Sequence, residues 1–133
     1  MRRRDGYEGR GRGRGRGRKR RRVLQFLQPC LLLLLQRGEA HGYALLDDLE
    51  QFGFDRTRVD PTLVYRALRE MEDAGWVQST WDDESQGPRR RVYTLHQEGA
   101  KQLAAWIEDL RKTRMEIDHL LSEYKVQEDH RKS

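Results

Sequence analysis

The chain has 133 residues, enough for one folded domain, and its net charge of +5 is unevenly distributed. Twelve of the 27 Lys and Arg residues but only two of the 22 acids lie in residues 1–22, so that segment carries +10 and the rest of the chain −5. Such an acidic remainder excludes nucleic-acid binding by general attraction, and binding there requires a local cluster of arginines.

Residues 1–22 form a low-complexity arm in which Arg alternates with Gly. Like charges and frequent Gly make ordering costly, so we predict a disordered, Arg/Gly-rich basic arm. Its Arg-Gly-Arg repeat is similar to the core of AT-hook arms, although the proline that follows that core is absent. Minor-groove DNA, RNA, an anionic surface and no partner at all are the alternatives for this arm.

A first helix is expected from about residue 24 or 29 to residue 36, ending before Gly38. Its unbroken apolar run over residues 30–35 is well short of the ~20 residues that cross a bilayer, so we predict a buried core helix in a cytoplasmic protein. Cys30 is the single cysteine and is expected to act as a small buried hydrophobe, which suits a reducing compartment.

A second helix is expected over residues 42–51, with Gly53 beyond its end. One side of it carries Tyr43, Leu46 and Leu49. The four histidines show no short paired spacing and Cys30 adds no cluster, so we predict no metal site. His41 is therefore assigned a structural role at the start of this helix.

The segment from Asp60 to Gly75 carries the clearest helix signals. Asp60 suits the N-cap, Pro61 suits the first turn, and Gly75 can adopt the left-handed conformation that ends a helix. An inward stripe is formed by Val64, Ala67, Leu68 and Met71. The opposite face carries Thr62, Tyr65, Arg66 and Arg69. This face is either solvated or built to bind a partner, and with the two preceding helices it predicts a helix-turn-helix arrangement.

Residues 76–81 and 90–95 alternate apolar and polar side chains around an acidic, turn-rich segment, which predicts a β-hairpin. Three arginines lie at the return of its loop, where a wing would run beside a phosphate backbone: Arg89, Arg90 and Arg91. Three acids precede them: Asp82, Asp83 and Glu84. These acids either face away from DNA or pair with the arginines when DNA is absent.

A last helix is expected from near Gln97 to about Gln127, followed by a flexible tail over residues 128–133. One side of it carries residues separated alternately by three and four positions: Leu103, Trp106, Leu110, Thr113, Ile117, Leu120 and Tyr124. This 3.5-residue period favours a seam against a second subunit, and packing within the same chain is the alternative.

The order of these elements and four short motifs resemble the PadR family of bacterial transcriptional regulators over nearly all of residues 23–124. The motifs are HGY at 41–43, TLVYRAL at 62–68, DESQGPRR at 83–90, and VYTL at 92–95 with Gly99 after it. The single C-terminal helix is similar to the shorter branch of that family. The resemblance implies a homodimer that represses transcription at an inverted-repeat operator and releases it on binding an effector.

The fold expected from the elements and the resemblance together is mainly α with a β-hairpin. We divide the chain into a basic arm (1–22), a winged helix-turn-helix DNA-binding domain (23–95), a dimerisation helix (96–127) and a flexible tail (128–133). His96 stands where the family pattern usually has Thr, a better helix cap, so the hinge before the last helix is expected to be less firmly fixed.

In this scheme the outer face of the third helix enters the major groove. Thr62 and Tyr65 can then meet phosphates or base edges, while Arg66 and Arg69 reach phosphates or a guanine. Tyr65 is alternatively a packing residue whose hydroxyl stays at the surface. Tyr43, Arg89 and Arg90 complete the expected DNA contacts, with the two arginines assigned to the phosphate backbone.

The resemblance also suggests where an effector binds. In the family branch that senses flat aromatic drugs, a tryptophan from each dimer helix lines a cavity between the subunits. Here Leu110 occupies the matching place and Trp106 lies one helical turn earlier, so Trp106 either lines such a pocket or is plain dimer core. The expected partners are double-stranded DNA, a second copy of the chain and a planar aromatic molecule, without a cofactor or a membrane.

Other classes of function are weighed against this one. We predict that the chain is not an enzyme, because it has no Ser-His-Asp spacing, phosphate loop, convincing carboxylate pair or metal motif. A winged-helix protein-interaction module is favoured by the acidic charge of the folded part. A nonspecific nucleic-acid binder that acts through its arginine arm is the third possibility.

Overall fold

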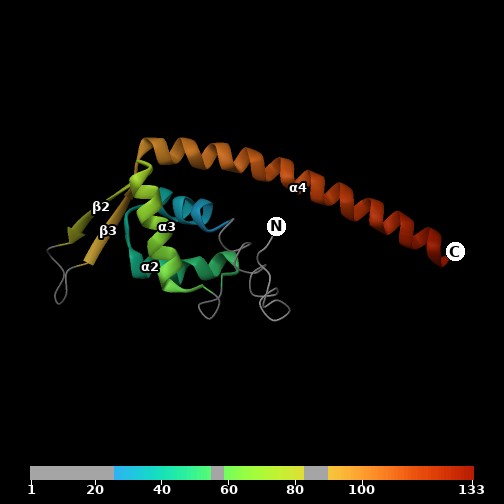
Figure 1. Cartoon of the computed structure of the whole chain (residues 1–133), viewed down its shortest axis with the longest axis horizontal. Coiled ribbons are helices and arrows are strands. Elements are labelled where there is room, and N and C mark those ends of the chain that lie inside the picture. Colours follow the sequence, from blue (N-terminus) through green and yellow to red (C-terminus); the bar gives the residue numbers. More distant parts are fainter. Residues whose placement is uncertain (1–25, 55–58, 83–89) are drawn as a thin grey trace, which may run out of the picture.

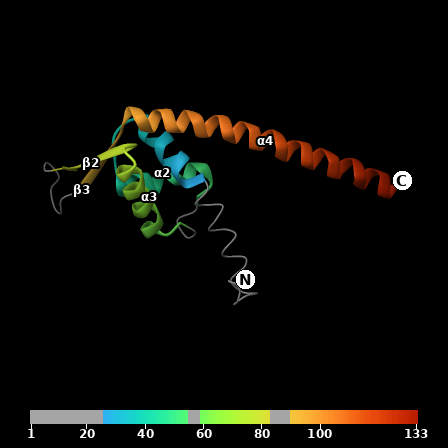
Figure 2. The same ribbon diagram turned by 45° about the horizontal axis from the view of Figure 1, so that its top comes forward.

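The computed structural model describes residues 26–54, 59–82 and 90–133. A helix over residues 26–36 is followed by β1 (Ala40–His41), α2 (Gly42–Asp48), the short 3₁₀ helix η1 (Leu49–Phe52), α3 (Pro61–Asp73), β2 (Val77–Asp82), β3 (Arg90–Leu95) and α4 (Gln97–Lys132). Figures 1 and 2 show a small domain from which α4 projects as a long rod. The prediction of a mainly helical fold with a β-hairpin is confirmed.

The core of the domain is made by aliphatic side chains of the first three helices. The helix over residues 26–36 contributes the largest share: Leu27, Leu31, Leu32, Leu34 and Leu35 are all buried. Cys30 packs against this core, half-buried, and burial raises the pKa of its thiol to about 11. The thiol is therefore protonated at neutral pH and a poor nucleophile. Within the described residues, no helix combines the length and apolar character needed to cross a membrane.

The second helix differs from the sequence prediction in two ways. It ends at Asp48 and continues as η1 to Phe52, instead of running as one α-helix to residue 51. Its buried positions are Gly42, Leu45, Leu46 and Leu49, whereas Tyr43 is 46% exposed. The spacing of three, four and seven from Gly42 defines the inward stripe, and this places Tyr43 on the outer side.

α3 forms as the sequence predicts. The Asp60 carboxylate accepts a hydrogen bond from the backbone N–H of Thr62 (2.9 Å), Pro61 occupies the first turn, and Gly75 follows the helix with φ of 83°. The buried residues are Val64, Ala67, Leu68 and Met71. The inward stripe read from the sequence is therefore confirmed residue by residue.

The three strands form an antiparallel sheet in the order β1-β3-β2. The hairpin of β2 and β3, called the wing below, pairs Val77 with Leu95 at its base and Asp82 with Arg90 at its far end. β1 adds the pairs Ala40 with Tyr93 and His41 with Val92. A two-residue strand is too short for alternation to reveal, so the sequence did not predict β1.

The wing is joined to α4 by a single residue, His96. Its side chain makes no capping hydrogen bond, which agrees with the expectation that it is a weaker cap than Thr. The backbone N–H of His96 instead donates to the carbonyl oxygen of Trp76 (2.9 Å), and Trp76 also packs edge-to-face on Trp106 at 5.3 Å between ring centroids. The base of α4 is thus fixed to the base of the wing by backbone and aromatic contacts.

α4 continues to Lys132, past the end expected near residue 127, so most of residues 128–133 belong to the helix. No Gly or Pro interrupts this stretch, and Arg131 forms an ion pair with Glu128 one turn earlier (3.1 Å). The last turn also carries Arg131 and Lys132, whose positive charge suits the negative end of the helix dipole.

Gly99 lies in the first turn of α4, where the helix packs closely against the base of the wing. A Cβ added there would collide with the carbonyl oxygen of Trp76 and would lie 2.8 Å from Leu95 Cδ1. The backbone oxygen cannot rotate away, so Gly99→Ala should lower the free energy of unfolding by about 2 kcal/mol, measured by urea titration at one fixed protein concentration. Lys101→Ala, at an exposed position on the same helix, is the control and should change it by less than about 0.5 kcal/mol. A Gly99→Ala protein as stable as the wild type would mean that α4 is free to shift at its base.

Candidate functional site

The outer face of α3 presents the four side chains that the sequence analysis singled out. Thr62, Tyr65, Arg66 and Arg69 are all exposed, on the side opposite the buried stripe. Tyr93 of the central strand lies near this helix. Burial is the main cause that raises the pKa of Tyr93 above its ordinary value, so its hydroxyl stays neutral at physiological pH.

Tyr65 connects α3 to the start of α2. Its ring lies so close to Gly42 that a Cβ on that glycine would be 2.5 Å from Tyr65 Cε1 and 3.1 Å from its hydroxyl oxygen. The side chain is still 39% exposed. Tyr65 therefore packs through one edge of its ring while part of the side chain remains accessible, and its two proposed roles are compatible.

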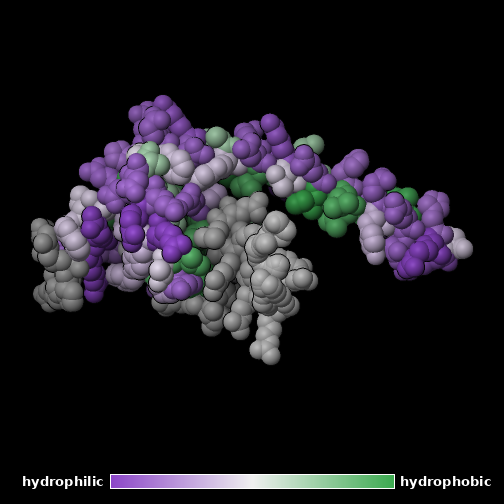
Figure 3. Space-filling model, viewed as in Figure 1, coloured by the Kyte–Doolittle hydropathy of each residue, from purple (hydrophilic) through white to green (hydrophobic). Residues whose placement is uncertain are grey.

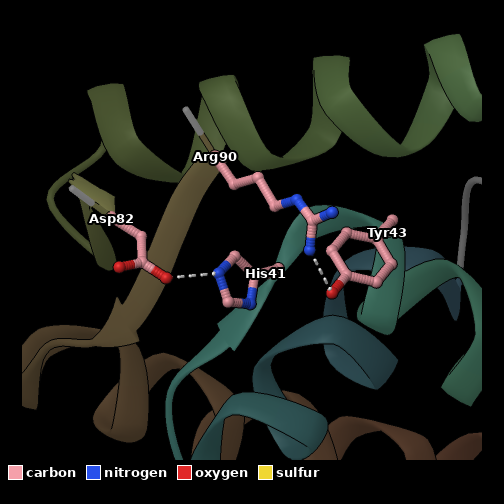
Figure 4. A network of polar contacts seen from close by, with 4 residues as sticks. All are labelled: His41, Tyr43, Asp82 and Arg90. Carbon is pink, nitrogen blue, oxygen red and sulfur yellow. Dashed lines mark hydrogen bonds and ion pairs between the residues drawn. The ribbon is translucent and has the colours of Figure 1, made fainter. Parts of the chain in front are cut away.

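Tyr43 and Arg90 are brought together from opposite parts of the chain. Arg90 Nη1 donates a hydrogen bond to the Tyr43 hydroxyl (2.9 Å), and the guanidinium carbon lies 4.9 Å from the centre of the Tyr43 ring (Figure 4). Both side chains are exposed. An arginine of the wing is thus held against an aromatic residue of the helix-turn-helix by a hydrogen bond and a cation–π contact.

His41 contacts the wing from the other side of Gly42. Its Nε2 lies 3.1 Å from Asp82 Oδ2, and its ring centroid is 5.5 Å from that of Tyr43. His41 occupies the N-cap position of α2, but its side chain makes no capping bond there. The His41 side chain therefore contacts the carboxylate of Asp82 in the wing and does not cap α2.

Arg91 has different neighbours from Arg90, because successive residues of a strand point to opposite faces. Its Nε donates to Ser79 Oγ (3.0 Å) and its guanidinium carbon lies 4.8 Å from the centre of the Trp81 ring. Ser79 in turn donates to Glu72 of α3 (2.8 Å). From the sequence, Arg89 and Arg90 but not Arg91 were expected to contact the phosphate backbone, and strand alternation separates Arg90 from Arg91. Arg89, Asp83 and Glu84 lie outside the described residues.

The heptad stripe of α4 divides into two parts. Near the domain, Leu103 is buried in the core of its own chain and Trp106 is half-buried against Trp76. Leu110 is half-buried, and beyond it the stripe is exposed: Thr113, Ile117, Leu120 and Tyr124. Leu121 lies on the same side and is also exposed. It was not among the expected stripe residues, although it is four residues after Ile117 and three before Tyr124. Figure 3 shows hydrophobic side chains gathered along this projecting part of the helix.

The described residues hold no group of three or more His, Cys, Asp or Glu side chains placed to bind a metal ion. The surface offers hydroxyl and guanidinium donors on α3 and the wing, and an apolar stripe on α4. Guanidinium and hydroxyl groups are the usual ligands of phosphate oxygens and base edges.

The model for the transcriptional regulator PadR-like family matches residues 31–105 of the chain. No significant match occurs among curated proteins. The chain is similar to the crystal structure of a PadR family transcriptional regulator from Eggerthella lenta, with 28% identity and a TM-score of 0.62 over 74% of this chain and 80% of that one. It is also similar to a PadR-like transcriptional regulator from Bacillus cereus, with 26% identity and a TM-score of 0.64 over 74% and 94% of the two chains.

A further likeness is to Bacillus subtilis PadR, whose crystal structure was determined in complex with operator DNA. The identity is 23% and the TM-score 0.54, over 61% of this chain and 46% of that one. At this identity the likeness concerns the fold, and it relates the winged domain described above to one that was crystallised on its operator.

Proposed function

Because the chain belongs to the PadR-like family of transcriptional regulators, we propose that it represses transcription by binding an inverted-repeat operator as a homodimer. The observation that carries the proposal is the outer face of α3, where Thr62, Tyr65, Arg66 and Arg69 are exposed on a helix that is capped and packed from behind. The operator complex of Bacillus subtilis PadR supports the assignment of DNA as the ligand of this fold.

In this proposal α3 lies in the major groove. Arg66 and Arg69 are three residues apart on the exposed face, so both guanidinium groups can reach one strand or a guanine edge. Thr62 and Tyr65 contact phosphates or base edges nearer the start of the helix, and Arg89 and Arg90 contact the backbone. Residues 23–133 carry a net charge of −5, so this local concentration of arginine must provide the attraction.

The test duplex is one that the wild-type chain selects from a random-sequence pool. Arg66→Ala should lower the affinity for this duplex about tenfold, measured by fluorescence anisotropy at physiological salt. Removal of residues 1–22 should lower affinity for all duplexes and flatten the salt dependence while the preference for the selected duplex is kept. Arg114→Ala, at an exposed position on α4, is the matched control and should bind as the wild type does.

Two results would reject this assignment in favour of the alternatives. Binding that disappears entirely with residues 1–22, without any preference among duplexes, would indicate a nonspecific nucleic-acid binder. A chain that selects no duplex from the pool would instead favour a winged-helix protein-interaction module. Unchanged affinity in Arg66→Ala would remove that residue from the binding surface.

We propose that the second subunit covers the exposed stripe of α4. Ile117, Leu121 and Tyr124 are separated by four and three residues, and they lie on one side of a helix that extends beyond the domain. A 3.5-residue apolar spacing is that of helices which pack along each other in a coiled coil. A two-fold dimer would present two copies of α3 to two half-sites, which is the arrangement an inverted repeat requires.

Replacing both Ile117 and Leu121 with Glu should convert the dimer to a monomer at micromolar concentration, because two charges would be placed in an apolar seam. The measurement is analytical ultracentrifugation. Met115→Glu is the matched control, since Met115 is 69% exposed on the same helix but lies off the stripe, and it should remain dimeric. A wild-type chain that is monomeric under these conditions would contradict the proposal.

We also propose that a planar aromatic effector binds beside Trp106 and Leu110 and releases the operator. Trp106 is only partly buried, and it lies where the stripe of α4 leaves the domain, packed edge-on against Trp76 at the base of the wing. A flat molecule that inserts there would contact the dimer helix and disturb the support of the wing. This would couple effector binding to DNA affinity.

Planar cationic dyes should quench the tryptophan fluorescence of the wild-type chain and lower its affinity for the selected duplex. Trp106→Ala should lose both effects while sedimentation still reports a dimer, since the stripe beyond Leu110 is intact. If no dye from a broad aromatic panel quenches the wild type, Trp106 is plain core and the effector proposal fails.

A further inference from the structure

The far end of the wing makes two contacts with residues that flank Gly42. Asp82 and Arg90 are register partners across the hairpin, yet their side chains diverge: Asp82 points to His41 and Arg90 points to Tyr43 (Figure 4). Gly42, between the two contacted residues, supports the ring of Tyr65. The tripeptide His41-Gly42-Tyr43 therefore touches both strands of the wing and α3.

We propose that Tyr43 and Arg90 form one composite binding site for a single DNA phosphate, shared between α2 and the wing. This proposal rests on the proposed function. The sequence suggested that Tyr43 and Arg90 contact DNA separately, whereas here the two side chains bind one phosphate together. The ligand chemistry is a phosphodiester oxygen of the duplex backbone.

The donors of the pair are arranged for such a ligand. A guanidinium group has five N–H donors, of which the Nη1 group of Arg90 uses one on the Tyr43 hydroxyl (2.9 Å). The hydroxyl accepts that bond, so its own proton is left to donate. Accepting a bond from a cation makes a hydroxyl a stronger donor. The two exposed groups can therefore donate together to the oxygens of one phosphate.

The stacking of Arg90 on Tyr43 fixes the guanidinium before DNA arrives. The guanidinium carbon lies 4.9 Å from the ring centre, within the range of a cation–π contact. An unrestrained arginine loses much of its rotamer freedom when it binds, and part of that loss has already occurred here. The pair should thus bind phosphate more tightly than the same two groups would if they acted independently.

The Asp82 carboxylate contacts His41, and this affects whether Asp82 can pair with Arg90. Asp82 is directly across the hairpin from Arg90, where oppositely charged side chains commonly pair. An ion pair between them would neutralise the arginine and compete with phosphate. His41 Nε2 lies 3.1 Å from the carboxylate of Asp82, and Figure 4 shows the His41 ring between that carboxylate and the guanidinium of Arg90. The guanidinium is thereby left to Tyr43 and the phosphate.

A double-mutant cycle on the full chain tests the composite site. Affinity for the selected duplex is measured by fluorescence anisotropy over a range of salt concentrations for wild type, Tyr43→Phe, Arg90→Gln and the double variant. Each single change should weaken binding about tenfold, and Arg90→Gln should also reduce the slope of log affinity against log salt by about 1. The double variant should be weakened by about tenfold to thirtyfold, well short of the hundredfold expected for independent groups.

Arg90→Lys distinguishes a shaped site from simple charge attraction. Lysine keeps the charge but lacks the planar guanidinium group that stacks on Tyr43 and donates to it, so Arg90→Lys should keep the wild-type salt slope. In the Arg90→Lys protein, the further change Tyr43→Phe should have little effect on affinity. Arg91→Gln is the matched control, because Arg91 is engaged with Ser79 and Trp81, and Tyr43→Phe should weaken binding in that background as much as in the wild type. Thermal melting of every variant checks that the fold is intact.

Additive losses in the double variant, or a Tyr43→Phe protein that binds as the wild type does, would overturn the composite site. Either result would leave the proposed function standing, since the wild type would still select a duplex. If the wild type selects none, the DNA-binding proposal itself fails.

Discussion

The close approach of the Tyr65 ring to the backbone of Gly42 is the contact on which the proposed binding surface depends. Any side chain larger than hydrogen at position 42 would displace the ring, and with it the relation between α2 and α3. The residues on either side of this glycine hold the far end of the wing, through Asp82 and Arg90. Three elements that are distant in the sequence are therefore positioned by one tripeptide.

A second junction lies at the base of the wing, around Trp76. Its carbonyl oxygen accepts a hydrogen bond from His96 and leaves no room for a side chain at Gly99, while its ring packs on Trp106 of α4. The wing is thus held at both ends, by the tripeptide at one and by α4 at the other. A movement of α4 in a dimer would be transmitted first to the wing, because His96 is the single residue between them. This gives the proposed effector response a physical route.

The distribution of charge suits DNA binding through a few individually placed arginines. The described domain combines an acidic overall balance with arginines that are individually oriented by neighbours: Arg90 by Tyr43, and Arg91 by Ser79 and Trp81. An acidic surface disfavours duplexes that do not fit, because poorly matched contacts leave phosphate near carboxylates. The fixed arginines supply attraction where the fit is right. Selectivity in this scheme comes from the position of a few cations.

The local properties of the chain could be read from its sequence. The limits and inward stripe of α3, the two strands of the wing and the start of α4 follow from capping residues, periodicity and turn residues that act within a few positions. The boundary errors have local causes as well: η1 replaces the end of the second helix, and an ion pair with Glu128 accompanies the extension of α4 to Lys132. The sequence pattern grouped Tyr43 with Leu46 and Leu49 on one side, whereas in the structure Leu45 takes the inward position and Tyr43 is exposed.

The pairing of Tyr43 with Arg90, of His41 with Asp82, and of Trp76 with Trp106 was decided by the tertiary structure alone. Each joins residues at least 30 positions apart, and the chemistry of a side chain does not specify which distant partner the fold will bring to it. The same holds for Gly42 and Gly99, whose importance comes from a ring and a carbonyl placed against them. The sequence by itself determined the elements and the faces that they expose. Only the packing of those elements decided which faces meet, because contact between remote residues depends on the whole path of the backbone.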